Sequence, residues 1–197
     1  MTASANSSDT GQIPLDQRRS VPARQLGEPG PDEATVLRML RSAVRVPDHG
    51  KRVPFRFVRI AGPARTRLGD ALAELAQRRD PEAPAAVLDK DRQRFSHAPL
   101  VIVVVAVLDP EDQQIPEQER LLSAGSVCFA LLQAAQSLGF GACWLTGWPA
   151  HDAEARRLMG LGPHERVAGF IHIGTPTLEA PERNRPDPRA LLSDLVL

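Results

Sequence analysis

Apolar residues recur every three or four positions in several stretches of the chain, which is the spacing of an amphipathic helix. The first such stretch predicts a helix that Asp32 caps, that continues through Arg45 and that Pro47 ends. Three further helices are predicted at residues 64–79, 85–95 and 152–159.

The dominant helix is predicted at residues 117–138, where Gly139 stops it. Leucines and valines are mixed there with Ala, Gly and Ser, so the helix is apolar nearly all round and needs cover on almost every side. A domain of this size covers so long a helix more easily with the help of a second subunit. We therefore expect residues 117–138 to form the central helix of a homodimer.

The strongest strand pattern is the run of β-branched residues at 100–108, which is bounded by prolines and predicts a strand buried on both faces. Shorter strands are predicted at residues 55–60, 141–146 and 166–174. Because the connections are irregular, the pattern favours a three-layer α+β domain over a regular doubly wound one. Residues 1–12 are expected to be a disordered tail and residues 13–197 a single domain.

The composition argues against nucleic acid and acidic membranes as partners. The 197 residues have a formal net charge of zero, which gives no overall basic field to attract nucleic acid or an acidic membrane. Nucleic-acid binding would have to use the basic residues Arg38, Arg41, Arg45, Lys51 and Arg52, the first three on one helical face, and they lack interleaved aromatic residues. No segment resembles a signal peptide, and the longest apolar run is too short to span a bilayer.

Cys128 and Cys143 stand in apolar surroundings without a CxxC pair or a metal-ligand spacing. We predict that both are small buried residues in a reducing compartment, which favours a cytoplasmic protein. The five histidines are scattered, so no metal site is predicted. Ser123 and Ser126 lie inside the predicted long helix without the glycines of a hydrolase nucleophile turn, so helix packing is their expected role.

Two basic motifs offer donors to an anion. Arg18, Arg19 and Ser20 supply two guanidinium groups and a hydroxyl, a set that suits a phosphate, although a solvated basic turn has the same composition. Arg183 and Arg185 follow the last predicted strand in a proline-rich tail and are each weak signals.

Two further motifs could contact a planar heterocyclic ring. The loop from Arg45 to His49 presents polar side chains between a helix and a strand, and it is otherwise a plain charged connector. The segment 139–147 carries Trp144 and Thr146 between glycines that also serve as a cap and a turn, and it is not a dinucleotide fingerprint.

Together, in this order and at these separations, the four motifs resemble the nitroreductase family, over nearly the whole chain and closest to its small bacterial branch. The resemblance implies an α+β fold with a mainly antiparallel central sheet flanked by helices. It implies FMN at the interface of a homodimer, and NADH or NADPH as reductant. The chain departs from many members at Val53, Pro54 and Phe55, where they carry Gln-Pro-Trp, and at Pro22, where they often carry a basic residue.

Site roles follow from the resemblance residue by residue. Arg18, Arg19 and Ser20 would bind the phosphate and ribityl chain. Arg45 and His49 would contact the flavin, and so would the strand around Trp144, Leu145 and Thr146. Arg185, or less securely Arg183, would complete the phosphate site. These residues are Arg18, Arg19, Ser20, Arg45, His49, Trp144, Leu145, Thr146, Arg183 and Arg185.

The implied activity is hydride transfer from NAD(P)H through flavin N5 to a small electrophilic acceptor, such as a nitroaromatic compound or a quinone. The cofactor carries this chemistry, so no side chain is predicted as a nucleophile. The alternatives are a flavin-binding protein of the same fold without nitroreductase turnover, and another flavin-dependent dehydrogenase or dehalogenase. The sequence leaves open which of His49, Arg45 or a backbone N–H group stabilises the reduced flavin.

Overall fold

The strand predicted to be most buried lies inside the sheet. In the computed structural model, which describes residues 15–196, strand β3 (Leu100–Val107) pairs antiparallel with β2 (Phe55–Ala61) on one side and with β5 (Glu165–Pro176) on the other. All of its residues except the last are buried. Its side chains alternate between two cores, with Val103 facing one and Val104 the other.

Two short strands complete the sheet along the free side of β5. Strands β4 (Gly141–Leu145) and β1 (Leu26–Gly27) both pair antiparallel with β5, so β4 is an edge strand. The sheet is therefore antiparallel throughout the described chain.

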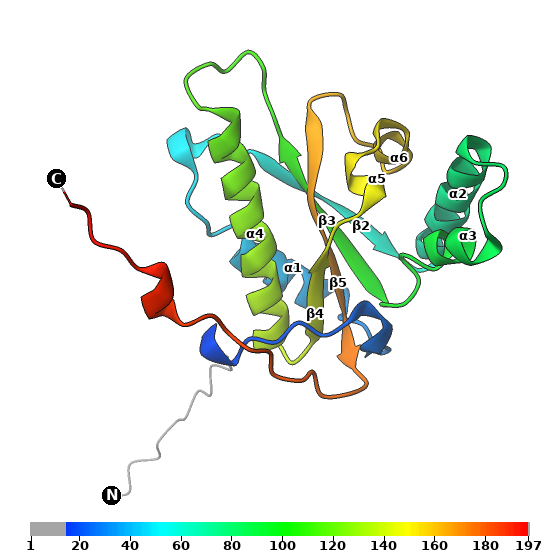
Figure 1. The fold of residues 1–197 in the computed structure, drawn as a ribbon, viewed down its shortest axis with the longest axis horizontal. Helices are drawn as coiled ribbons and strands as arrows, with labels where there is room; N and C mark the ends of the chain where they lie inside the picture. The colour runs from blue at the N-terminus through cyan, green and yellow to red at the C-terminus, as the bar shows by residue number, and fades with distance from the viewer. Residues whose placement is uncertain (1–14, 197) are drawn as a thin grey trace, which may run out of the picture.

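Helices cover both faces of the sheet in three layers, which confirms the predicted α+β architecture (Figure 1). Helices α1 (Glu33–Ala43) and α4 (Glu117–Ser137) pack against one face. Helices α2 (Pro63–Arg79), α5 (Trp148–His151) and α6 (Ala153–Leu158) cover the other, and α3 (Ala85–Arg92) packs on α2.

The predicted element ends are close to the observed ones, with a few corrections. Asp32 caps α1 by accepting a 2.8 Å hydrogen bond from the Thr35 backbone N–H, as predicted. That helix ends at Ala43 and not at Arg45, because the chain leaves the helical hydrogen-bond pattern before Pro47 is reached. Helix α3 stops at Arg92, three residues before the predicted end. The final segment forms a short 3-10 turn at Pro188–Leu191.

The predicted tail, residues 1–12, lies outside the described residues, as do the first residues assigned to the domain. Beyond β5 the chain first follows the body of the molecule, where Ala180 is buried, and its last part leaves the body as an arm (Figure 1). Its apolar side chains are largely exposed, and they belong to Leu191, Leu192, Leu195 and Val196. None of the helices in the described part of the chain has the length and apolar character needed to cross a membrane.

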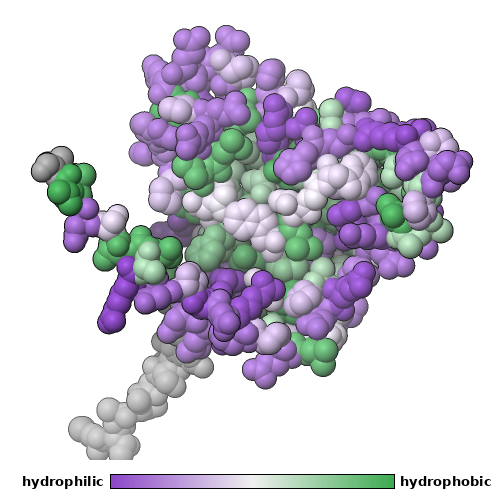
Figure 2. Space-filling view, viewed as in Figure 1, coloured by the Kyte–Doolittle hydropathy of each residue, from purple (hydrophilic) through white to green (hydrophobic). Residues whose placement is uncertain are grey.

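Helix α4 is less completely covered within one chain than its composition predicts. Its inner residues, such as Val127 and Leu131, are fully buried, but Leu121, Leu122 and Phe129 are exposed along one face. Figure 2 shows apolar side chains gathered over this side of the molecule, with hydrophilic side chains around them. One apolar face of α4 thus remains open in the single chain.

Candidate functional site

A cavity of about 450 Å³ lies against the edge strand β4. Its walls come from β4, from α3 and the residues after it, from the segment following Ser20, and from Arg183 in the C-terminal tail. The volume lies in the range of pockets that hold a small organic ligand or cofactor. The cavity is lined by Ser20, Pro22, Ala23, Arg24, Lys90, Gln93, Arg94, His97, Cys143, Trp144, Leu145 and Arg183.

The edge position of β4 explains why its side chains are exposed to the cavity. An edge strand has one row of neighbours, so Trp144 and Leu145 remain 39% and 42% exposed although they belong to the sheet. Trp144 is held in place by its indole N–H, which donates to the Ala168 carbonyl at 3.1 Å. The Val21 N–H donates to the Ala142 carbonyl at 3.0 Å and fixes the Ser20 segment beside the start of the strand.

Residues from the two arginine motifs lie together in the structure. Arg18 donates to the Ser20 hydroxyl at 3.0 Å, and Arg185 donates to the Arg18 carbonyl at 3.3 Å. Glu182 joins them, because its carboxylate pairs with Arg19 and, at 3.0 Å, with Arg185. These ends of the chain are far apart in sequence and become neighbours only through folding.

The residues of this cluster differ in how they face the cavity. Ser20 and Arg183 line it directly, whereas Arg18 lies behind Ser20. Arg19 lines a neighbouring hollow of about 360 Å³. The backbone N–H of Arg183 and the nearby Arg19 hold the pKa of Glu182 below its ordinary value, so this carboxylate stays charged at neutral pH.

Arg45 and His49 lie outside the β4 cavity. Arg45 lines a shallow groove along the open face of α4 that also touches Trp144, so this groove and the β4 cavity share one side chain. His49 binds Glu119 near the start of α4, with 2.6 Å between Nδ1 and Oε2. Gln136, near the end of the same helix, donates to the Arg19 carbonyl.

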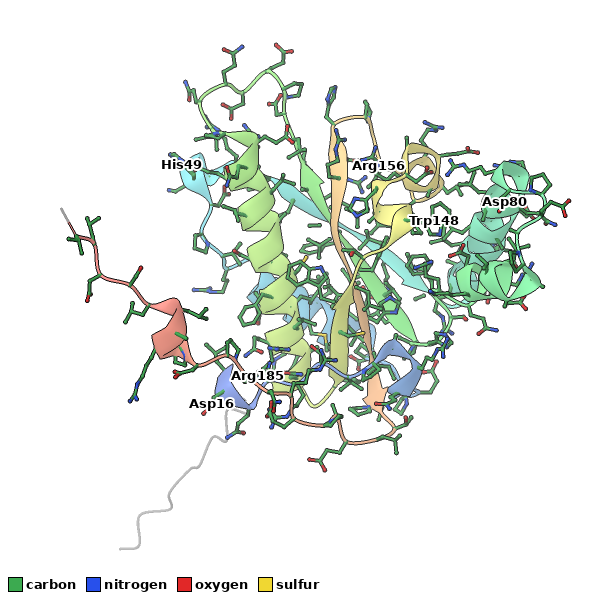
Figure 3. All side chains as sticks on the ribbon, viewed as in Figure 1. Asp16, His49, Asp80, Trp148, Arg156 and Arg185 are labelled. Carbon is green, nitrogen blue, oxygen red and sulfur yellow. The ribbon has the colours of Figure 1, made fainter. Side chains whose placement is uncertain are left out.

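Helix α4 therefore separates His49 from the arginine cluster (Figure 3). Glu119 and Gln136 are 17 positions apart, which corresponds to roughly 25 Å at 1.5 Å per residue. Within one chain, His49 and Arg19 belong to different regions of the surface. Thr146 is exposed just beyond the end of β4 and is not part of the cavity wall.

Several cavity residues were not singled out from the sequence. Lys90, Gln93, Arg94 and His97 reach the wall because α3 and the loop after it face β4 across the cavity, and Arg24 comes from the segment after Ser20. No local motif marks them, since their position depends on a contact between distant segments. Burial, and then the charge of Arg24, lower the pKa of His97.

The cavity wall is basic. Four of its residues, Arg24, Lys90, Arg94 and Arg183, are permanent cations at neutral pH, and no Asp or Glu of the described chain lines it. Such a wall favours an anionic ligand.

Two cysteines, Cys128 and Cys143, and the histidine His172 are buried. Burial raises the pKa of both Cys128 and Cys143 to about 12, so the thiols stay protonated, and both are free and buried as predicted. His172 is 1% exposed, as expected for a core histidine, and its ring stacks on Phe95 with centroids 6.0 Å apart.

Comparison with known proteins places the chain in a family. The profile of the Nitroreductase family matches residues 15–175. The Escherichia coli K12 protein "Putative NAD(P)H nitroreductase YdjA" is 35% identical over 177 residues, which are 88% of this chain and 93% of that protein. A Haemophilus influenzae protein with a similar description is 32% identical over 77% of this chain and 82% of its own length. The chain belongs to the nitroreductase family.

Solved structures agree on the fold. A nitroreductase-like family protein from Bacillus cereus superposes with a TM-score of 0.75 at 22% identity, covering 99% of this chain and 98% of its own. A Bacteroides fragilis nitroreductase with bound FMN superposes with a TM-score of 0.66 at 17% identity, covering 92% and 96%. At these identities the likeness concerns the fold.

Proposed function

We propose that the protein is an FMN-dependent oxidoreductase that transfers hydride from NADH or NADPH, through flavin N5, to a small electrophilic acceptor such as a nitroaromatic compound or a quinone. It acts as a homodimer in the cytoplasm, with FMN between the subunits. The observation that carries this proposal is the β4 cavity, which brings Ser20 and Arg183 together with Trp144 and Leu145.

The residues present fit such a cofactor. A phosphate needs concentrated N–H and O–H donors; Ser20 and Arg183 supply them at the cavity wall, and Arg18 and Arg185 are next to Ser20 outside the lining. A planar ring needs a flat apolar wall, which Trp144 and Leu145 provide. No carboxylate of the described residues lines the cavity itself, and the Glu182 carboxylate in the adjoining cluster is paired with Arg19 and Arg185.

Bound FMN would supply the redox chemistry, accepting and then giving up hydride at N5. The chain's own residues bind and orient it. Trp144 is fixed by its bond to Ala168 and cannot swing away from the wall without losing that bond. The basic wall attracts the anionic nicotinamide cofactor as well as FMN.

A second copy of the chain completes the site in this proposal. The open face of α4, with Leu121, Leu122 and Phe129, supports a subunit contact there. The uncovered apolar arm after Pro188 supports it too, since a partner surface would shelter its leucines. His49 then acts on the cavity of the opposite subunit, because within one chain it lies at the other end of α4 from the arginine cluster. Arg45 lies in the groove that shares Trp144 with the cavity.

The first test is the visible absorption spectrum of the purified protein. We expect oxidised-flavin bands, or their appearance on adding FMN, and bleaching of these bands by NADH or NADPH. A colourless protein that does not bind added FMN would refute the proposal. Bound flavin that neither nucleotide reduces in stopped-flow mixing would instead identify a flavin-binding protein without this turnover.

The phosphate end is tested by a matched pair of tail variants. Arg183→Gln removes a cation from the cavity wall, whereas Arg189→Gln removes one six residues further along the exposed tail. We expect the first to weaken FMN binding by roughly tenfold, as for the loss of one charge-assisted hydrogen bond, and the second to leave it unchanged. Equal affinities would remove Arg183 from the site.

The dimer is tested by analytical ultracentrifugation at micromolar concentration. A stable, well-folded monomer would refute both the subunit contact through α4 and the shared site.

A further inference from the structure

A network on α3 and α5 fixes one guanidinium at the cavity wall. Asp91 is 4% exposed and accepts hydrogen bonds from Arg94, with 3.1 Å between Nε and Oδ1. The same carboxylate oxygen accepts the Trp148 indole N–H at 2.9 Å. A buried carboxylate with two donors is a rigid anchor, so Arg94 has little freedom to turn away from the cavity that it lines.

The anchor leaves part of the guanidinium free. Nε and Nη2 of Arg94 both bind Asp91, and Nη1 has no hydrogen-bond partner among the described residues. Nη1 lies against the backbone of Gly147, where an added Cβ would come within 2.9 Å of it. Gly147 has φ 144°, a conformation that other residues rarely adopt. The turn after β4 thus leaves room for the guanidinium, with its free N–H groups at the cavity.

Arg94 and Ser20, which belongs to the proposed phosphate site, lie at opposite ends of β4. Ser20 is beside Ala142 through the Val21 hydrogen bond, and Arg94 is beside Gly147. Five residues of extended chain separate these points by roughly 16 Å. In FMN the phosphate is at the end of the ribityl chain, which is attached to the ring at N10, beside N1 and C2=O. A flavin held by its phosphate near Ser20 therefore directs its ring toward Arg94.

We propose that Arg94 is the residue that stabilises the negative charge of the reduced flavin, and that Asp91 and Trp148 are its positioning residues. This inference rests on the proposed function. Hydride transfer from NAD(P)H adds two electrons and one proton to the ring, leaving one extra negative charge on it and NAD(P)⁺ as product. A guanidinium keeps its proton at every physiological pH and is already oriented, so it favours the reduced state over the oxidised one.

The test is the midpoint potential of bound FMN, with the affinity for oxidised FMN measured separately by fluorescence quenching. In the double variant Asp91→Asn/Arg94→Gln, both charges are removed together, so no carboxylate is left buried without its partner, and the introduced amide oxygen still accepts from Trp148. We expect reduced FMN to lose roughly 10- to 100-fold more affinity than oxidised FMN, which lowers the potential by about 30 to 60 mV for a two-electron couple. Arg94→Lys keeps the positive charge but not the planar guanidinium, so its midpoint potential should lie between those of the wild type and the double variant.

Arg92→Gln is the matched control. Arg92 is two residues away on α3, pairs with Asp70 and Asp89, and does not line the cavity, so its removal should leave the potential unchanged. An unchanged potential in the double variant overturns the role of Arg94 while the proposed function stands. An equal loss of affinity for both redox states also overturns it, since Arg94 would then only bind the cofactor. A wild-type protein that binds no FMN instead refutes the proposed function.

Discussion

Trp144 shows how one side chain links two surfaces. It lines the β4 cavity on one side and the groove along α4 on the other. Its indole lies directly over Gly169 of β5, where a Cβ would come within 2.1 Å of Nε1. The absence of a side chain at Gly169 is therefore what permits the ring to approach the backbone of β5 and to reach the Ala168 carbonyl.

We predict that Gly169→Ala displaces Trp144 and lowers the free energy of unfolding by about 1–3 kcal/mol through overpacking. Affinity for FMN should fall with it, and tryptophan fluorescence should report the changed environment of the indole. Gly162→Ala is the control, since the atoms nearest to its added Cβ are no closer than 3.7 Å. If Gly169→Ala matches this control in both measurements, the indole is not held by this contact.

His172 gives a prediction about pH. Burial, and then the positive charges of His97 and Arg94, lower the pKa of His172 to about 4 from the ordinary 6.5. The unfolded chain binds a proton here below pH 6.5 while the folded chain stays neutral, so stability falls as the pH drops from 6.5 toward 4. Between about pH 7 and pH 5 the loss is about 2 kcal/mol.

The variant His172→Phe keeps an aromatic ring beside Phe95 and removes the buried Nδ1, which has no partner among the described residues. Urea unfolding at about pH 7 and pH 5 should show that this histidine's share of the pH dependence has gone. His151→Gln, at an exposed position, serves as the control. A variant that loses as much stability on acidification as the wild type would contradict the assignment.

At the scale of elements, an ion pair connects two strands that are not neighbours. Arg56 of β2 donates to Glu165 at the start of β5 across the intervening β3, with 2.7 Å between Nη2 and Oε2. This hydrogen bond lowers the pKa of Glu165 below its ordinary 4.5, against the opposing effect of burial. The pair's contribution is therefore complete above pH 4.5 and is lost as the pH falls through the lowered value.

We predict that Arg56→Met lowers the free energy of unfolding by about 1 kcal/mol at pH 7, a modest value because Arg56 is 38% exposed and screened by solvent. The difference from wild type should shrink in denaturant titrations below about pH 4, where Glu165 is protonated. Arg157→Met, whose guanidinium has no carboxylate partner within residues 15–196, is expected to match wild type. A difference that persists undiminished at about pH 3 would show that packing, and not charge, is lost.

Long elements were predictable because their sequence carries the whole signal. The apolar run at 100–108 and the helix at 117–138 each match the observed element to within one residue. Strand β1 has two residues and α5 has four, too few for any periodicity. Strand β1 exists only because Leu26 and Gly27 pair with Pro176 and Thr175, a contact that no local pattern specifies.

The candidate site likewise contains residues that a sequence motif marks and residues that only the fold identifies. Arg18, Arg19 and Ser20 form a compact motif that stands out in the sequence, as do Arg183 and Arg185 near the other end. Arg94 and Lys90 are ordinary residues of a polar segment, and only the fold brings them to a cavity that β4 also lines. Residues of this second kind need the tertiary structure to be found.

At the scale of the whole molecule, the open face of α4 leads to a prediction about assembly. Leu122→Glu places a charge in the middle of this face, where Leu122 is 62% exposed in the single chain. We expect the variant to sediment as a folded monomer that retains FMN poorly. Leu158→Glu, on α6 across the sheet, should remain dimeric, because Leu158 is also exposed but lies in another layer. Identical sedimentation of both variants and wild type would place the subunit contact elsewhere.

The separation of the His49 loop from the arginine cluster along α4 has a genetic consequence. If each site takes one part from each subunit, two inactive variants can rescue one another when they are co-expressed. Arg18→Glu damages one part and His49→Glu the other, so one site of a mixed dimer carries both lesions and its second site is intact. Random pairing then restores flavin to about a quarter of all sites. Co-expression of Arg18→Glu with Arg183→Glu, which damage the same part, restores none.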